Sequence, residues 1–143
     1  MTGIDYPTIT IGERQLTVRL SLAAQLLMQR RGIDPATMAQ AMQPRKTIPN
    51  PAMRIQIDPP TIEVANPDAV QNIITVFSCM VAENFLDTKS TKLDLNSAPT
   101  ADYWATQIDD FGEVEKVVWA AVGKAVEERR KRLAAVPPME AAS

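Results

Sequence analysis

Residues 66–87, NPDAVQNIITVFSCMVAENFLD, carry the clearest helical pattern in the chain. Asn66-Pro67 is typical of a helix start, because the first turn of a helix tolerates the missing N–H of proline. Apolar residues then recur every three or four positions and form one wide face, namely Val70, Ile73, Ile74, Phe77, Met80, Val81 and Phe85. The pattern predicts a helix that ends near Asp87 and that packs against the rest of the fold.

Two more helices are predicted on the C-terminal side of this stretch. Residues 87–99 are polar and predict a loop, after which Thr100 is expected to cap a short helix that contains Tyr103, Trp104 and Ile108. Asp109-Asp110 is expected to cap the last helix, whose apolar face is Phe111, Val114, Val118, Ala121, Val122 and Ala125. The sequence leaves open whether these two helices are continuous. Residues 136–143 are expected to form an extended tail.

The N-terminal side predicts a β-hairpin that leads into a helix. Residues 8–11 and 16–20 alternate polar and apolar on either side of the polar segment 12–15, GERQ. The apolar face of this hairpin is Ile9, Ile11, Leu16 and Val18. Ser21 is expected to cap a helix from Leu22 to about Arg31, followed by Gly32 as its C-terminal residue. The apolar face of that helix is Leu22, Leu26 and Leu27.

A short helix from Pro35 to about Met42 is expected next, and a proline-rich stretch follows it. Residues 44–67, which we call the arm, hold six of the 11 prolines, a density that excludes a helix there. Alternating residues at 53–58 and 61–64 predict two short strands. These form a second hairpin beside the first, or the arm is loosely held. The chain is thus expected to be α+β and mainly helical, with three to five helices in one domain over residues 1–135.

Composition excludes several kinds of chemistry. With no His among 143 residues, a Ser-His-Asp triad, a Cys-His nucleophile and a His-ligated zinc site are all impossible. The single Cys excludes an internal disulfide, and a lone thiol fits a reducing cytoplasm. No apolar stretch approaches the ~20 residues needed to span a bilayer, and no signal peptide is expected. We therefore expect a protein that is not an enzyme and that needs no cofactor.

Charge is unevenly distributed along the chain. The formal net charge is −2, but residues 1–60 hold seven basic and four acidic side chains, whereas residues 61–143 hold eight basic and thirteen acidic ones. This asymmetry is compatible with head-to-tail self-association. Eight acids lie between Glu83 and Glu115. They are compatible with a paired-carboxylate catalyst or a metal site, but ordinary helix caps are the favoured interpretation.

A basic run and a lone cysteine also have two interpretations each. Arg129, Arg130, Lys131 and Arg132 are either a binding site for an acidic partner or nucleic acid, or the solvated C-terminal end of a helix. The helix end is favoured, because no aromatic residues that could stack on bases lie among them. Cys79 is expected to be a small buried hydrophobe rather than a reactive thiol, since no neighbouring cation is apparent in the sequence.

The N-terminal third resembles the opening of tail assembly chaperones of long-tailed bacteriophages. The resemblance lies in a strand, a Gly turn and a second strand over residues 9–20, followed by the Leu-rich helix SLAAQLL from Ser21 that ends at Arg31-Gly32. It extends more loosely to the helix around residues 117–121 and its basic end. The arm departs from the compact members of that family.

The resemblance implies a non-enzymatic role in the host cell cytoplasm. Members of the family bind the tape-measure protein, help to recruit tail-tube subunits and often self-associate. The contact surfaces that we expect are Ile9, Ile11, Leu16 and Val18 of the hairpin and Leu22, Leu26 and Leu27 of the helix, although the same side chains could simply form the core. The alternative is a structural virion component, such as a tail-completion or head–tail connector protein, whose arm reaches a neighbouring subunit. A nucleic-acid-binding regulator is the least favoured hypothesis.

Overall fold

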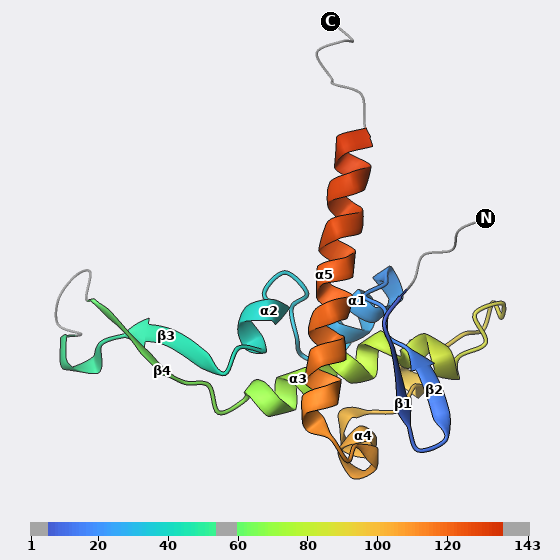
Figure 1. The fold of residues 1–143 in the computed structure, drawn as a ribbon, viewed down its shortest axis with the longest axis horizontal. Coiled ribbons are helices and arrows are strands. Elements are labelled where there is room, and N and C mark those ends of the chain that lie inside the picture. Colours follow the sequence, from blue (N-terminus) through green and yellow to red (C-terminus); the bar gives the residue numbers. More distant parts are fainter. Residues whose placement is uncertain (1–5, 54–59, 136–143) are drawn as a thin grey trace, which may run out of the picture.

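Helix α3 (Ala69–Met80) crosses the middle of the fold, as Figure 1 shows for the computed structural model, which describes residues 6–53 and 60–135. The other four α-helices pack around it: α1 (Leu22–Arg30), α2 (Met38–Ala41), α4 (Ala101–Gln107) and α5 (Phe111–Ala135). Residues 75–82 of this central segment are all buried. The stretch that carries the clearest helical pattern is therefore the one that the fold surrounds.

The central helix is shorter than its sequence pattern predicts. It ends at Met80, and a 3-10 helix over Ala82–Phe85 (η2) continues the chain toward Leu86. This change of direction brings the Asn84 side chain against Thr17, where its Nδ2 donates to the carbonyl O of Thr17 at 2.8 Å and its Oδ1 accepts from the N–H at 3.1 Å. The expected end near Asp87 was wrong because these long-range bonds favour an early turn.

The first hairpin pairs β1 (Thr8–Ile11) with β2 (Arg14–Thr17) in antiparallel register. Ile11 lies opposite Arg14, so the loop is only Gly12-Glu13 and not the four residues that the polar segment suggested. Gly12 has a φ of +64°, and no described non-Gly residue has a positive φ. Of the two favoured two-residue turns, only type II′ fits these angles. The predicted N-terminal hairpin is confirmed, with a tighter turn.

The capping residues predicted for α1 are both in place. Ser21 Oγ accepts from the Ala24 N–H at 3.1 Å, and its hydroxyl donates to Glu83 Oε1 at 2.6 Å. At the other end Gly32 has a φ of +89°, the Ile33 N–H bonds to Met28 O and the Gly32 N–H bonds to Gln29 O. These two bonds make a Schellman motif, which explains why the helix ends there.

The other three predicted helices are present and match their expected limits to different degrees. Helix α2 spans only Met38–Ala41, because Pro35 begins a turn in which Asp34 Oδ1 accepts from the Ala36 N–H. Thr100 precedes α4 without a side-chain cap bond. Helices α4 and α5 are separate, and the Asp110 carboxylate caps α5 by accepting from the Glu113 N–H at 3.3 Å.

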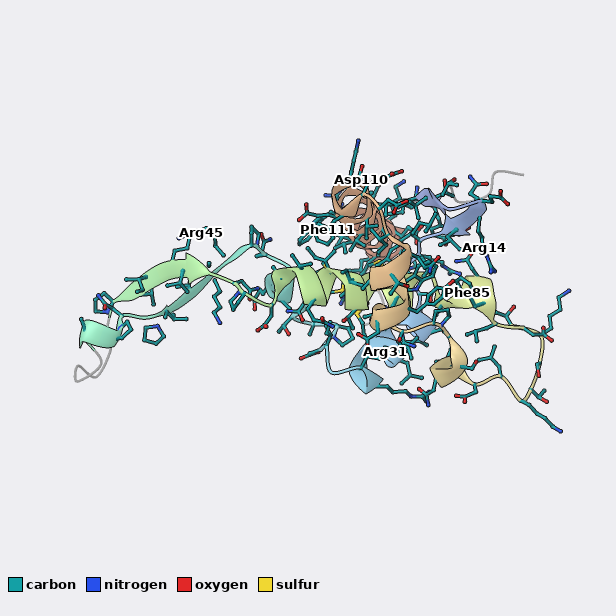
Figure 2. All side chains as sticks on the ribbon, turned by 90° about the horizontal axis from the view of Figure 1, so that it is seen from below. Arg14, Arg31, Arg45, Phe85, Asp110 and Phe111 are labelled. Carbon is teal, nitrogen blue, oxygen red and sulfur yellow. The ribbon has the colours of Figure 1, made fainter. Side chains whose placement is uncertain are left out.

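The arm forms a second hairpin that projects away from the body in Figures 1 and 2. Its strands β3 (Arg45–Pro49) and β4 (Thr61–Ala65) pair only with each other, so the hairpin does not extend the first sheet. The second predicted strand is confirmed, but the first was misplaced. Met53 lies in the 3-10 helix Pro51–Met53 (η1), and the remaining positions, 54–58, lie outside the described residues, as does the expected tail at 136–143.

The core sits where the first hairpin, α1, α3 and α5 meet. All four elements contribute fully buried side chains, among them Leu16, Leu27, Met28, Ile73, Phe77, Val114 and Val118. Trp104 of α4 closes one side, with its ring 5.4 Å from Phe77 and 5.6 Å from Phe85 in edge-on contacts. The expected fold class, α+β and mainly helical, is confirmed. None of the described helices is both long and apolar enough to cross a membrane.

Candidate partner-binding groove

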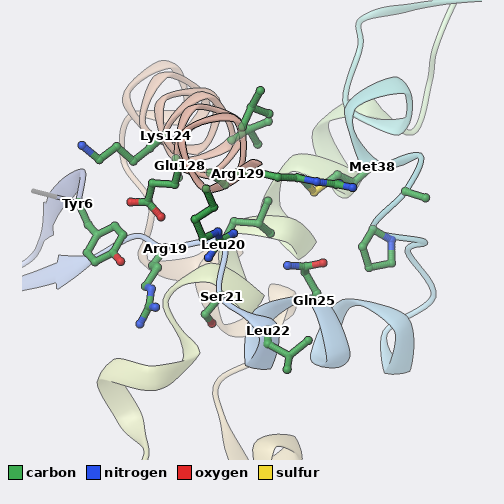
Figure 3. A pocket seen from close by; sticks show the side chains of 17 residues that line it. Tyr6, Arg19, Leu20, Ser21, Leu22, Gln25, Met38, Lys124, Glu128 and Arg129 are labelled. Atoms are coloured by element: carbon green, nitrogen blue, oxygen red, sulfur yellow. The ribbon is translucent and has the colours of Figure 1, made fainter. Parts of the chain in front are cut away.

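A groove runs between α1 and the half of α5 that extends beyond the body (Figure 3). It has a volume of about 540 Å³, and an adjoining hollow of about 410 Å³ extends it across Leu26, Gln29 and Asp34. The groove and the hollow share Leu22, Gln25, Pro35, Ala36 and Arg129, so they form one continuous surface, which we call the groove. No described segment of the chain fills it.

Apolar side chains line one wall of the groove and stand out into solvent. Leu22 is 81% exposed and Leu26 is 40% exposed on α1, and across from them Val126 of α5 is 62% exposed. Single exposed apolar side chains are common, but their gathering around one groove suggests a surface for a partner. The helix spacing of Leu22 and Leu26, one turn apart, suits an apolar stripe on a partner helix.

Basic side chains gather along the same groove. Arg19, Lys124, Arg129 and Arg132 line it, against two carboxylates, Glu128 and Asp34. Arg129 reaches from α5 across the groove toward Met38 in Figure 3, whereas Lys124 points outward. A partner that combines an apolar stripe with acidic flanks would therefore match both the shape and the charge of this surface.

One carboxylate oxygen in the groove accepts no hydrogen bond from the described residues. It is the Oε1 atom of Glu128, which is covered from solvent. Figure 3 shows this side chain pointing from α5 toward Tyr6 and Arg19, whose guanidinium lies 4.9 Å from the Tyr6 ring.

The structure divides the residues expected to form contact surfaces into two groups. Ile9, Leu16, Val18 and Leu27 are buried and Ile11 packs against the core, so these side chains hold the monomer together. The alternative weighed from the sequence, that they form the core, applies to these five residues. Leu22 and Leu26 face solvent instead, and the structure brings them together with Arg129 and Arg132.

The other two members of the basic run lie outside the groove. Lys131 donates to Glu127 at 3.1 Å, and its hydrogen bond and charge hold the pKa of the Glu127 carboxyl below its usual value. Arg130 is exposed. The helix periodicity explains the division, because residues 129 and 132 lie on one face of α5 and residues 130 and 131 do not.

Sequence reasoning missed the role of Arg31. Its guanidinium donates to Ser78 Oγ at 2.8 Å and to the carbonyl oxygens of Ala98 and Pro99 at 2.9 and 3.1 Å. The same group lies near Cys79, where a cation was not expected. Burial nevertheless raises the pKa of the Cys79 thiol, because desolvation outweighs the positive charge of Arg31. Arg31 therefore ties α1 to α3 and to the loop before α4.

Several residues of the groove also had no signal in the sequence. Tyr6, Arg19 and Gln25 reach it only because the first hairpin and α1 pack under α5. For Val126 the sequence does offer one signal, because its i, i+3 spacing to Arg129 places both residues on one face of the helix. Among the described residues, no three carboxylates or thiols gather in a way that could hold a metal ion.

No family model, curated protein or solved structure matches this chain. The groove and the arm therefore supply the observations on which a function can be proposed.

Proposed function

We propose that this chain is a non-enzymatic tail assembly chaperone of a long-tailed bacteriophage. In this role it binds the tape-measure and tail-tube proteins in the host cytoplasm, and it needs neither a cofactor nor nucleic acid. The observation that carries the proposal is the groove, where the exposed Leu22 and Leu26 lie beside Arg129 and Arg132. The likeness of residues 9–32 to the opening of that family directs the proposal toward tail assembly.

The groove fits the task physically. A tape-measure protein is expected to be a very long helical chain, whose apolar stripes would aggregate unless they are covered. An amphipathic helix held in a groove buries such a stripe reversibly, and apolar area contributes roughly 25 cal/mol per Å² removed from water. The basic rim adds orientation and speeds encounter with an acidic partner more than it adds affinity.

The test is co-expression with the full-length protein encoded by the long reading frame beside this gene. We expect the two chains to elute together, and we expect Leu22→Asp combined with Arg129→Glu to weaken binding about tenfold or more, as for a lost hot spot. Val70→Asp is the matched control, since Val70 is an exposed apolar residue of α3 outside the groove. If the groove variant folds and still binds as the wild type does, or if no such reading frame lies nearby, the proposal fails.

A second candidate function is a structural component of the virion, such as a tail-completion or head–tail connector protein. The observation that favours it is the projecting arm, which reaches well beyond the body in Figure 1. Purified mature particles distinguish the two functions. A chaperone is absent from them, whereas a structural component is present in a fixed number of copies.

A further inference from the structure

The arm has one apolar face that no described part of the chain covers. Lys46 lies opposite Val64 and Ile48 lies opposite Ile62, so these four side chains share one face of the hairpin. Ile62 is 37% exposed, and no described residue of the arm belongs to the core. Because an isolated two-stranded hairpin is only marginally stable in water, this face points to a contact with another molecule.

The other face of the arm is polar. There the Arg45 Nε donates to Glu63 Oε1 at 2.8 Å, and Thr47 lies opposite Glu63. Lys46 is therefore the charged group of the apolar face, and it makes no ion pair within the described ranges. A matching surface should offer carboxylates beside apolar side chains.

A hollow of that kind lies on the body, between β1 and the start of α5. Its volume is about 170 Å³, several times the ~30 Å³ that a water molecule occupies in the liquid. Ile11 and Ile108, which are only partly buried, contribute apolar surface, and Asp109, Asp110 and Glu113 contribute carboxylates. In the part of the chain that the structure describes, none of these three carboxylates forms an ion pair.

A single copy cannot bring these two surfaces together. Figure 1 shows the arm on one side of the body and β1 on the other, with α3 and α5 between them. Asn66 holds the base of the arm, because its Nδ2 donates to the carbonyl oxygens of Ala41 and Gln43 at 3.1 and 2.9 Å. An arm that fills this hollow therefore belongs to a second copy of the chain.

We propose that the apolar face of the arm docks in the acidic hollow of a second copy and joins copies head to tail. Lys46 then approaches Asp109 and Glu113 of the next copy while Ile48 and Ile62 lose contact with water. The alternative pairing of two arms would place two copies of Lys46 on one small surface, where like charges repel. A head-to-tail contact is heterologous and produces a ring or a helical filament. The contact does not use the groove, so it stands independently of the proposed function.

The test is the mass of the full chain by analytical ultracentrifugation over a range of concentrations. The wild type is expected to self-associate, and Lys46→Glu and Asp109→Lys are each expected to raise the dissociation constant about tenfold or more, a factor typical of one lost buried contact. Lys92→Glu is the control, because it makes the same charge change at an exposed site away from both surfaces.

A mixture of the two variants provides the sharper test. Lys46→Glu chains keep an intact hollow and Asp109→Lys chains keep an intact arm, and the two exchanged charges also attract each other, so the mixture should associate more tightly than either variant alone. A monomeric wild type overturns the proposal, as does a mixture that stays monomeric. Dimers that survive Asp109→Lys but not Lys46→Glu would show arm-to-arm pairing and would overturn it as well.

Discussion

The two β-hairpins of this chain have opposite surroundings. The first, β1–β2, buries Ile9 and Leu16 in the core, and Asn84 bonds to the edge of β2 at Thr17. The second, β3–β4, leaves Ile62 facing solvent. Alternation at residues 8–11 and 61–64 predicts a strand in both hairpins but not what covers it. Whether other elements cover a hairpin decides whether it stabilises the fold or remains free to bind.

The largest expected difference between the hairpins is in stability. Leu16→Ala should lower the free energy of unfolding by about 2–5 kcal/mol, because it leaves a cavity in a closed core. Ile62→Ala should change it by about 0.5 kcal/mol or less, as is usual for exposed positions. Urea denaturation followed by circular dichroism, at a low protein concentration, measures both. An equal loss of unfolding free energy in the two variants would show that another part of the same chain covers Ile62.

The next difference lies between two arginines that are bonded in different ways. Arg31→Gln should lower the free energy of unfolding by about 1–3 kcal/mol, because it leaves the carbonyl oxygens of Ala98 and Pro99 without their donor inside the body. Arg45→Gln should cost about 0–1 kcal/mol, since its ion pair with Glu63 is solvent-exposed. The same denaturation experiment tests both. If the Arg45 variant were the less stable of the two, the distinction between a packed body and an open arm would fail.

The smallest expected effect concerns pH and the buried thiol. Burial raises the pKa of Cys79 in the folded state above the ordinary value of 9.0, which the unfolded chain keeps. The thiol therefore contributes its full stabilisation below about pH 9, and the contribution is lost as the pH rises above that value and the unfolded state releases the proton. The stability difference between the wild type and Cys79→Ala should therefore be constant up to about pH 8 and shrink near pH 10. Urea titrations at both pH values measure it. A difference that does not change with pH would contradict a buried, protonated thiol.

Local signals in the sequence were enough to predict much of the fold. The hydroxyl of Ser21, the left-handed conformation available to Gly32 and the carboxylate of Asp110 each act within a few residues, so the helix ends that they set were predictable. The limits that were mispredicted depend on distant partners. The early end of α3 depends on bonds between Asn84 and Thr17, and the first strand of the arm depends on its pairing with β4.

The groove was only partly predictable. The exposed apolar residues Leu22 and Leu26 and the basic Arg129 and Arg132 were each identified, because each follows a helix face. The sequence could not show that the two faces meet, since that depends on how α5 crosses the body (Figure 1). The sequence also could not show that Leu22 and Leu27, on the same helix, differ in exposure. Leu22 is 81% exposed and Leu27 is 0% exposed.

Amide hydrogen exchange of the chain, alone and with the co-expressed tape-measure protein, tests the central claim most directly. In the free chain, amides of α5 beyond Gly123 should exchange faster than those at residues 114–121, because the body does not cover them. In the complex, we predict slower exchange in α1 and in residues 124–134, with little change at residues 114–121. A complex that forms while exchange in α1 and in the end of α5 stays as in the free chain would contradict the proposal that the groove binds the partner.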